Sequence, residues 1–301
     1  MAGKIPSFSF TSRNLRTLRF LSKFPWVRKI PKDVFITSIY IPDLDQKAQV
    51  RLCIYRPKPI ASPLPVLIWL HGGGYIIGKP EQDDQFCIRC ASELGCMVVS
   101  VDYRLAPRHS FPSPLEDAYC ALTWVDSHAS MLGIDPKRIA IGGQSAGAGL
   151  AAALAQFTHE LGEVRPVFQL LVYPMLDDRT CLRAELADRR YFIWDQESNR
   201  FGWESYLGQK CGQKYAPLYS VPARCENLAG LPPAWIGVGT LDLFHDEDME
   251  YARRLQEHGV ACELEVVTGA FHAFDILAPG SQVAQDFRDA QIAALKRAFG
   301  A

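Results

Sequence analysis

The stretch of sequence that decides the fold is IAIGGQSAGAGLAAAL, at residues 139–154. The apolar run 139–141 predicts a short buried strand, and the alanine- and leucine-rich residues that begin at 146 predict a helix. Between them, Gly143 and Gly147 lie two positions on either side of Ser145. Glycine at both places predicts a turn so sharp that larger side chains there would collide.

Short apolar runs of the same kind recur along the chain, at 34–40, 50–55, 66–70, 97–101, 168–172, 235–238 and 263–267. Helical patterns lie between them or follow them, at 84–94, 114–128, 146–161, 246–258 and 282–299. Nearly continuous apolar runs are typical of strands that are covered on both faces. We therefore predict a single α/β domain over 1–301, with a mostly parallel central sheet flanked by helices.

One connection is far longer than the others. Roughly 60 residues separate Tyr173 from Pro232, which exceeds a normal connection in such a fold. This stretch is rich in aromatic residues, namely Tyr191, Phe192, Trp194, Phe201, Trp203 and Tyr206. We expect about 177–228, together with the N-terminal 1–32, to form a helical cap over the carboxyl ends of the strands. Open sheets bind ligands there, so at least one of these aromatic residues is expected to line a pocket.

The composition excludes several classes of protein. The chain has 32 basic and 33 acidic residues and a formal net charge of −1, which disfavours a nucleic-acid or anionic-membrane partner. Its nine cysteines are odd in number and irregularly spaced, which favours reduced thiols and a cytoplasmic location. Cys87 and Cys90 form a C-x-x-C, but no second pair follows at ligand spacing. We predict two buried thiols there and no metal site.

The N-terminal 1–32 is basic and has no acidic residue. No apolar run in the chain approaches the roughly 20 residues that span a bilayer, so we expect no stable membrane insertion. The segment also lacks the apolar core of a secretory signal. We expect a helix that packs its apolar face on the protein body, while an organellar presequence and a lipid-contacting helix remain open alternatives.

Three polar residues follow predicted strands at one face of the sheet. Ser145 is the candidate nucleophile, because the sharp turn lifts its Oγ clear of the sheet. Asp242 follows the strand 235–238, and His272 follows the strand 263–267. We predict that His272 removes the serine proton and that Asp242 orients the imidazole. A structural turn with a serine N-cap remains an alternative for Ser145, as does His245 for the base.

A glycine-rich loop follows the strand 66–70. Consecutive glycines at Gly72, Gly73 and Gly74 leave backbone N–H groups without side chains in the way. With the amide of Ala146, Gly73 and Gly74 are the predicted donors of an oxyanion hole, and Gly72 is a further candidate. His71 is expected to brace the loop. A phosphate-binding loop would expect a lysine or a helix start next, whereas Tyr-Ile-Ile follows.

Together these motifs resemble the hormone-sensitive-lipase-like esterases, also called bacterial family IV. The resemblance rests on HGGG at 71–74, DYRLAP at 102–107, the turn at 143–147, DLFHDE at 242–247 and FHAF at 271–274. It implies an α/β-hydrolase core with a helical cap, no cofactor or metal, and hydrolysis of small esters with short to medium acyl chains. Homodimers are frequent in the family. Gln144 departs from it, because many members carry an acidic residue just before the nucleophile.

Two other functions stay open. An amide-cleaving deacetylase would use the same three residues, and hydrolase folds of this kind also serve as non-catalytic ligand receptors. In such receptors a member of the triad is typically replaced. Here all three positions are intact, which favours the esterase.

Overall fold

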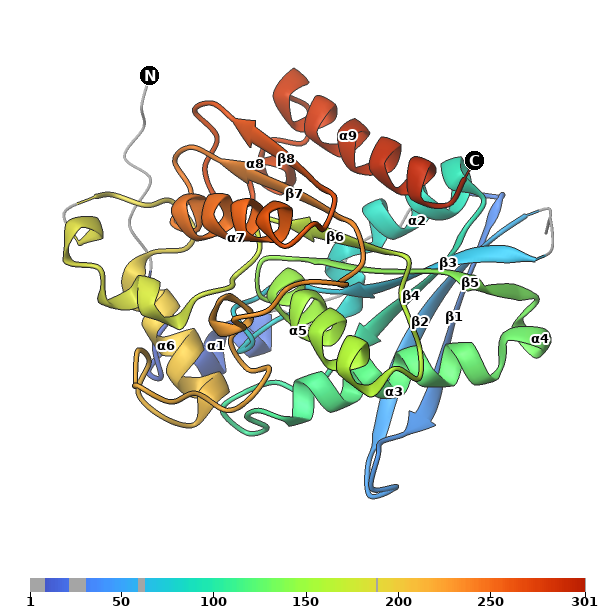
Figure 1. Cartoon of the computed structure of the whole chain (residues 1–301), viewed down its shortest axis with the longest axis horizontal. Helices are drawn as coiled ribbons and strands as arrows, with labels where there is room; N and C mark the ends of the chain where they lie inside the picture. The colour runs from blue at the N-terminus through green and yellow to red at the C-terminus, as the bar shows by residue number, and fades with distance from the viewer. Residues whose placement is uncertain (1–8, 22–30, 59–62, 188, 301) are drawn as a thin grey trace.

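The computed structural model describes residues 9–21, 31–58, 63–187 and 189–300. An eight-stranded sheet in the order β1-β2-β4-β3-β5-β6-β7-β8 runs through the molecule (Figure 1). The strands are β1 (Val34–Pro42), β2 (Gln49–Pro57), β3 (Leu64–Leu70), β4 (Met97–Asp102), β5 (Ile134–Gln144), β6 (Phe168–Val172), β7 (Ala234–Gly239) and β8 (Cys262–Val267). Strands β3 to β8 are parallel, and β2 pairs antiparallel with both β1 and β4. The predicted α/β fold with a mostly parallel sheet is confirmed.

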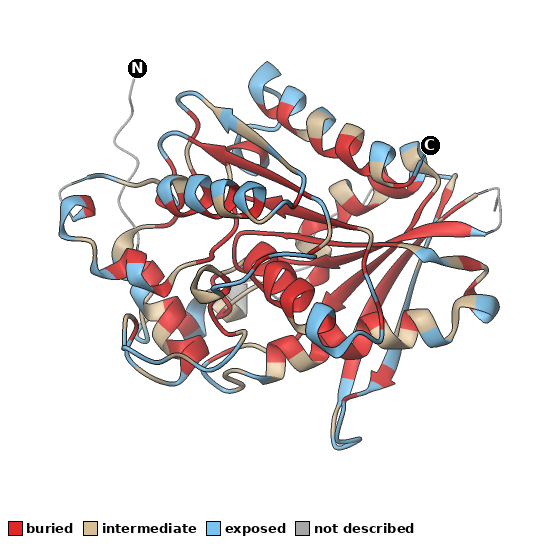
Figure 2. Cartoon of the chain, viewed as in Figure 1, coloured by how far each residue is buried: buried red, intermediate tan, exposed pale blue. Residues whose placement is uncertain are grey.

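Two helical layers cover the sheet. One holds α2 (Asp84–Leu94) and α9 (Gln282–Ala298), and the other holds α3 (Ser113–Ser127), α5 (Ala146–Leu161) and α7 (His245–Glu257). Successive side chains of β3 enter opposite cores, with Ile68 packing in the α3–α5–α7 layer and Trp69 in the α2–α9 layer. Figure 2 shows the result: the central strands β3, β6 and β7 are buried along their length, the edge strands β1 and β8 are partly exposed, and the helices are exposed on their outer faces. A strand buried on both faces requires the continuous apolar run seen in the sequence.

Smaller elements complete the chain. The short helices are α1 (Leu15–Leu21), α4 (Ala129–Leu132) and α8 (Phe274–Leu277), and α6 (Gln196–Leu207) is longer. Single 3₁₀ turns are η1 (Pro80–Asp83), η2 (Asp178–Leu182), η3 (Ala184–Leu186) and η4 (Pro222–Arg224). In the described residues no helix is both long and apolar enough to span a membrane.

The N-terminal segment contains one described helix, α1. The rest of the helix expected within 1–32, at 1–8 and 22–30, lies outside the described residues. Arg19 of α1 donates hydrogen bonds to the carbonyls of Ile76 (2.9 Å) and Ala106 (2.5 Å), just beyond the glycine-rich loop. The N-terminal segment is therefore fastened beside that loop.

The long connection between β6 and β7 holds η2, η3, α6 and η4. Within it, Cys181 and Cys211 form a disulfide, so the expectation that all nine cysteines are reduced thiols is wrong for this pair. The error arose because spacing alone carries no sign that residues 30 positions apart meet. Cys87 and Cys90 are buried free thiols, as predicted.

Candidate active site

The sharp turn after β5 places Ser145 between the last residue of the strand and the first residue of α5. Ser145 has φ 54° and ψ −122°, a region that non-glycine residues rarely adopt. A Cβ at Gly143 would lie 2.5 Å from a backbone atom of Gly147, and one at Gly147 would lie 2.0 Å from the carbonyl oxygen of Leu70. Both glycines are thus required by close backbone approach, which is the collision anticipated from the sequence.

Ser145, His272 and Asp242 form a continuous hydrogen-bonded line. His272 Nδ1 lies 2.8 Å from Asp242 Oδ2, and its Nε2 lies 3.0 Å from Ser145 Oγ. A carboxylate only accepts hydrogen bonds, so Nδ1 carries the proton and Nε2 is left to accept from the serine hydroxyl. All three residues are almost fully buried, with 3–6% of their surfaces exposed. This arrangement suits removal of the hydroxyl proton by the imidazole.

Aromatic rings hold the imidazole in place. Phe244 meets the His272 ring edge-on, with centroids 5.2 Å apart, and Tyr173 lies 4.9 Å away. The backbone N–H of Phe244 also donates to Asp242 Oδ1 at 3.0 Å, which leaves Oδ2 directed at the histidine. Neither aromatic residue was predicted from the sequence to contact the histidine. The one available signal was their position, directly after β6 for Tyr173 and two residues beyond Asp242 for Phe244.

The glycine-rich loop passes beside the nucleophile. A Cβ at Gly72 would lie 3.5 Å from Ser145 Cβ, and Gly73 and Gly74 have φ values of 126° and 58°. Among the described residues, no hydrogen bond is donated by the backbone N–H of Gly73, Gly74 or Ala146. Ala146 is the first residue of α5, where amides have no partner within the helix. These amides are free to donate to a bound oxygen.

His71 lies under the loop and away from the nucleophile. It is fully buried, donates from Nδ1 to the carbonyl of Gly72 (2.8 Å) and stacks on Tyr103 with centroids 4.2 Å apart. Burial lowers the pKa of His71, so it stays neutral. The other candidate base, His245, hydrogen-bonds Asp246 at the start of α7. Only His272 of the described histidines is hydrogen-bonded to Ser145.

Gln144, the residue that departs from the family resemblance, hydrogen-bonds an aspartate and a tyrosine side chain. Its Nε2 donates to Asp83 Oδ1, and its Oε1 accepts from the Tyr173 hydroxyl at 3.2 Å. Trp69 Nε1 donates to the other oxygen of Asp83 at 2.8 Å. Burial raises the pKa of Asp83 to about 8. A carboxyl group from η1 thus lies one hydrogen bond from the residue that precedes the candidate nucleophile.

Aromatic residues of the long insertion reach the site from two sides. Gly74 lies under Trp194, since a Cβ on it would come within 2.0 Å of the indole. Trp194 in turn packs on Phe10 of the N-terminal segment, with centroids 5.3 Å apart. Phe192 lies 5.7 Å from Phe271, the neighbour of His272. The insertion and the N-terminal segment therefore meet next to the glycine-rich loop.

In the described ranges, no group of three or more histidine, cysteine, aspartate or glutamate side chains is arranged to hold a metal ion.

Comparison with known proteins supports one family. Residues 67–276 match the family model described as the alpha/beta hydrolase fold. Esterase LipI of Mycobacterium tuberculosis is 37% identical over 225 residues, covering 73% of this chain and 69% of the relative. Carboxylesterase NlhH of the same species is 34% identical over 259 residues, covering 85% and 81%.

Solved structures agree with these relatives. A bacterial heroin esterase superposes with a TM-score of 0.86 at 36% identity, covering 95% of this chain and 90% of that one. Esterase LipW from Mycobacterium marinum gives 0.85 at 36% identity, covering 97% and 92%. The chain therefore belongs to the hormone-sensitive-lipase-like branch of the α/β-hydrolase fold, a family of carboxylic ester hydrolases.

Proposed function

We propose that this protein is a serine carboxylesterase that hydrolyses small esters with short to medium acyl chains. One observation carries the proposal: the buried hydrogen-bonded line from Ser145 through His272 to Asp242. The names of the relatives support the reaction class, because the similar proteins are esterases and carboxylesterases. The acyl range follows from the family resemblance.

The reaction proceeds in two halves. Ser145 Oγ attacks the ester carbonyl while its proton passes to His272 Nε2, and a tetrahedral intermediate forms. The amides of Gly73, Gly74 and Ala146 donate to the oxygen that becomes negative, with Gly72 as a further donor. The intermediate collapses as the imidazolium protonates the leaving alcohol. Water then attacks the acyl-serine and loses a proton to His272. The imidazolium returns that proton to Ser145 Oγ as the bond from Oγ to the acyl carbon breaks, and the carboxylic acid leaves.

Segments 1–32 and 177–228 are proposed to act together as the cap that shapes the substrate site. The contacts of Trp194 with Gly74 and Phe10, and of Phe192 with Phe271, support this role. Aromatic residues from the cap would bound the space that the acyl and alcohol groups occupy. Chain-length preference is then a property of the cap, separate from the chemistry.

The test is hydrolysis of p-nitrophenyl esters from acetate to palmitate by the wild type, Ser145→Ala and the control Ser130→Ala. Ser130 is exposed on α4, so its variant should match the wild type. Cleavage of the short esters that is lost only in Ser145→Ala is the expected result. A folded wild-type protein that cleaves no ester faster than Ser145→Ala would reject the proposal. Cleavage of acyl anilides in preference to esters would point to a deacetylase.

A further inference from the structure

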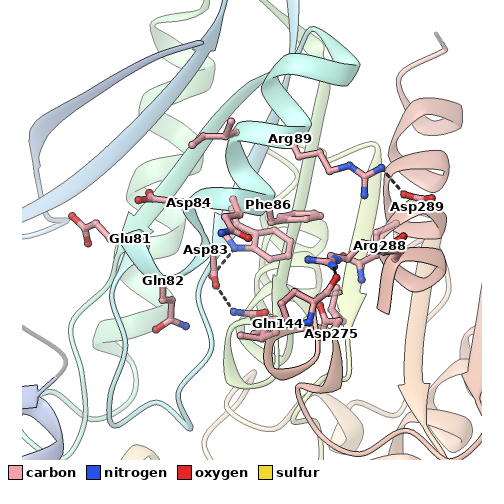
Figure 3. Close-up of a pocket in the computed structure, with 18 residues that line it drawn as sticks. Glu81, Gln82, Asp83, Asp84, Phe86, Arg89, Gln144, Asp275, Arg288 and Asp289 are labelled. Carbon is pink, nitrogen blue, oxygen red and sulfur yellow. Dashed lines mark hydrogen bonds and ion pairs between the residues drawn. The ribbon is translucent and has the colours of Figure 1, made fainter. Parts of the chain in front are cut away.

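A cavity of about 700 Å³ lies on the α2–α9 side of the sheet, behind the candidate nucleophile. Its walls come from η1, α2, α8 and α9, and its inner end is formed by residues at the ends of strands, Trp69, Gln144 and Val172. Ser145, Asp242 and His272 do not line it. Figure 3 shows Asp83, Gln144 and Asp275 together at one end of this cavity, with the Arg89–Asp289 pair beside α9. The space is large enough for a small organic molecule.

Two buried carboxyl groups stand at the inner end. Asp83 is 5% exposed and Asp275 is 6% exposed. Asp83 accepts from Trp69 and Gln144, and Asp275 accepts from the Tyr173 hydroxyl at 2.9 Å. All of these donors are neutral. A buried carboxylate without a cationic partner is costly, and burial accordingly raises the pKa of both groups.

The two arginines that line the cavity make their hydrogen bonds to groups other than the two carboxyls, although the charge of Arg288 acts through space to lower the pKa of Asp275. Arg89 pairs with Glu93 and Asp289, at 2.7 and 2.5 Å. Arg288 donates to the backbone carbonyls of Ala284 and Pro279. Within the described ranges, no ion pair joins a lysine or arginine to Asp83 or Asp275. Neither carboxyl group is therefore bonded to a cation in the described structure, and burial still outweighs the charge of Arg288 at Asp275.

A third polar group in the lining is also unsatisfied. Gln291 of α9 is only 2% exposed, and its Nε2 has no hydrogen-bond partner in the described structure. A buried amide without a partner is unfavourable, so a ligand or water that accepts from it would be stabilised. Aromatic surface lies close by, because Trp69 and Phe86 pack with their centroids 4.4 Å apart and both line the cavity.

We propose that this cavity binds an organic ammonium ion that carries an apolar body. Asp275, and Asp83 once the bound cation has displaced its proton, would supply the negative charge. Trp69 and Phe86 would supply the aromatic faces that attract cations, and Gln291 a hydrogen-bond donor for a polar group of the ligand. A metal ion is the weaker occupant, because no described cluster has a metal-binding set of side chains. The ammonium group comes either from an arm of an ester substrate, which rests on the proposed function, or from a separate amine.

Titration calorimetry with benzyltrimethylammonium tests the proposal directly. Neopentylbenzene has the same shape without the charge and serves as the matched probe. We expect the cation to bind the wild type and Ser145→Ala alike, and the neutral probe to bind at least about tenfold more weakly. Asp275→Asn keeps an acceptor for Tyr173 but removes a charge, and it should weaken cation binding by about tenfold or more. Phe86→Leu, at a half-buried position, is a second variant expected to weaken it.

The outcomes separate the two sources and the two proposals. Competitive inhibition of p-nitrophenyl acetate hydrolysis by the cation would assign the ammonium to the substrate, and non-competitive inhibition would assign it to a separate amine. Equal binding of the cation and the neutral probe, or no binding of the cation, would overturn the ammonium site. Cation binding by a protein that hydrolyses no ester would overturn only the proposed function.

Discussion

Replacing Asp248 by alanine should stabilise this protein, and more so as the pH rises. Asp248 lies in the first turn of α7, is fully buried, and neither carboxyl oxygen has a hydrogen-bond partner among the described residues. Burial, together with the neighbouring Glu247 and Asp242, holds its pKa well above the usual value. The folded chain therefore keeps the carboxyl protonated at pH values where the unfolded chain releases that proton.

The magnitude follows from proton linkage. Stability falls with pH wherever the folded state binds more protons than the unfolded state, by up to about 1.4 kcal/mol per pH unit for one group. The wild type should therefore lose up to about 2.8 kcal/mol of unfolding free energy through Asp248 between pH 5 and pH 7. Alanine removes that loss and leaves a small cavity that costs about 1 kcal/mol at all pH values.

Urea denaturation followed by tryptophan fluorescence at pH 5, 6 and 7 measures this difference. The advantage of Asp248→Ala over the wild type should grow by up to about 2.8 kcal/mol across the range. Asp246→Ala is the matched control, since Asp246 lies two residues away, is half exposed and pairs with Arg183. It should show no such gain. A pH-independent difference, or an Asp248→Ala variant less stable than the wild type at pH 7, would refute the reasoning.

Three further changes test the site. Asp242→Asn should lower kcat by about 10⁴-fold, because an amide facing Nδ1 favours the wrong tautomer of His272; steady-state kinetics at an unchanged melting temperature would show it. Gly147→Ala should give little folded protein, because the new Cβ would meet a carbonyl oxygen of β3 at 2.0 Å; soluble yield and circular dichroism report this. Tyr173→Phe should cost about 1–3 kcal/mol of stability, because it deprives Asp275 of its hydroxyl donor; a urea midpoint equal to that of the wild type would contradict this.

Much of the fold was predictable because the apolar pattern of a buried strand is visible in a few consecutive residues. The run at 66–70 lies inside β3, whose alternate residues enter two different cores, and only a continuous apolar run satisfies both. The antiparallel pairing of β2 with β4 was not predictable in this way. Strand direction depends on which partners meet across the sheet, and the apolar pattern is the same in either direction.

The candidate site, like the fold, was predictable only in part. Ser145, Asp242 and His272 could be chosen as candidates because each follows a predicted strand, and parallel strands end at one edge. Asp83, 61 residues before Gln144 in the chain, could not be linked to it, because a hydrogen bond between distant segments leaves no periodic signal. The Cys181–Cys211 disulfide could not be predicted for the same reason. The burial of Asp248 could not be predicted for another reason. In the sequence it is an ordinary acid at a helix start, and only the packing of α7 shows that its side chain is buried.

The insertion between β6 and β7 has an evolutionary consequence. Ser145, Asp242, His272 and the glycine loop all come from segments outside it, and their mutual hydrogen bonds depend on the sheet. A mutation in the insertion can therefore change its aromatic residues without removing a member of the hydrogen-bonded line from Ser145 through His272 to Asp242. The contact of Trp194 with Gly74 marks the boundary of this freedom. Descendants of such a scaffold are therefore free to diversify within the insertion, except where the Trp194 indole packs on the glycine-rich loop.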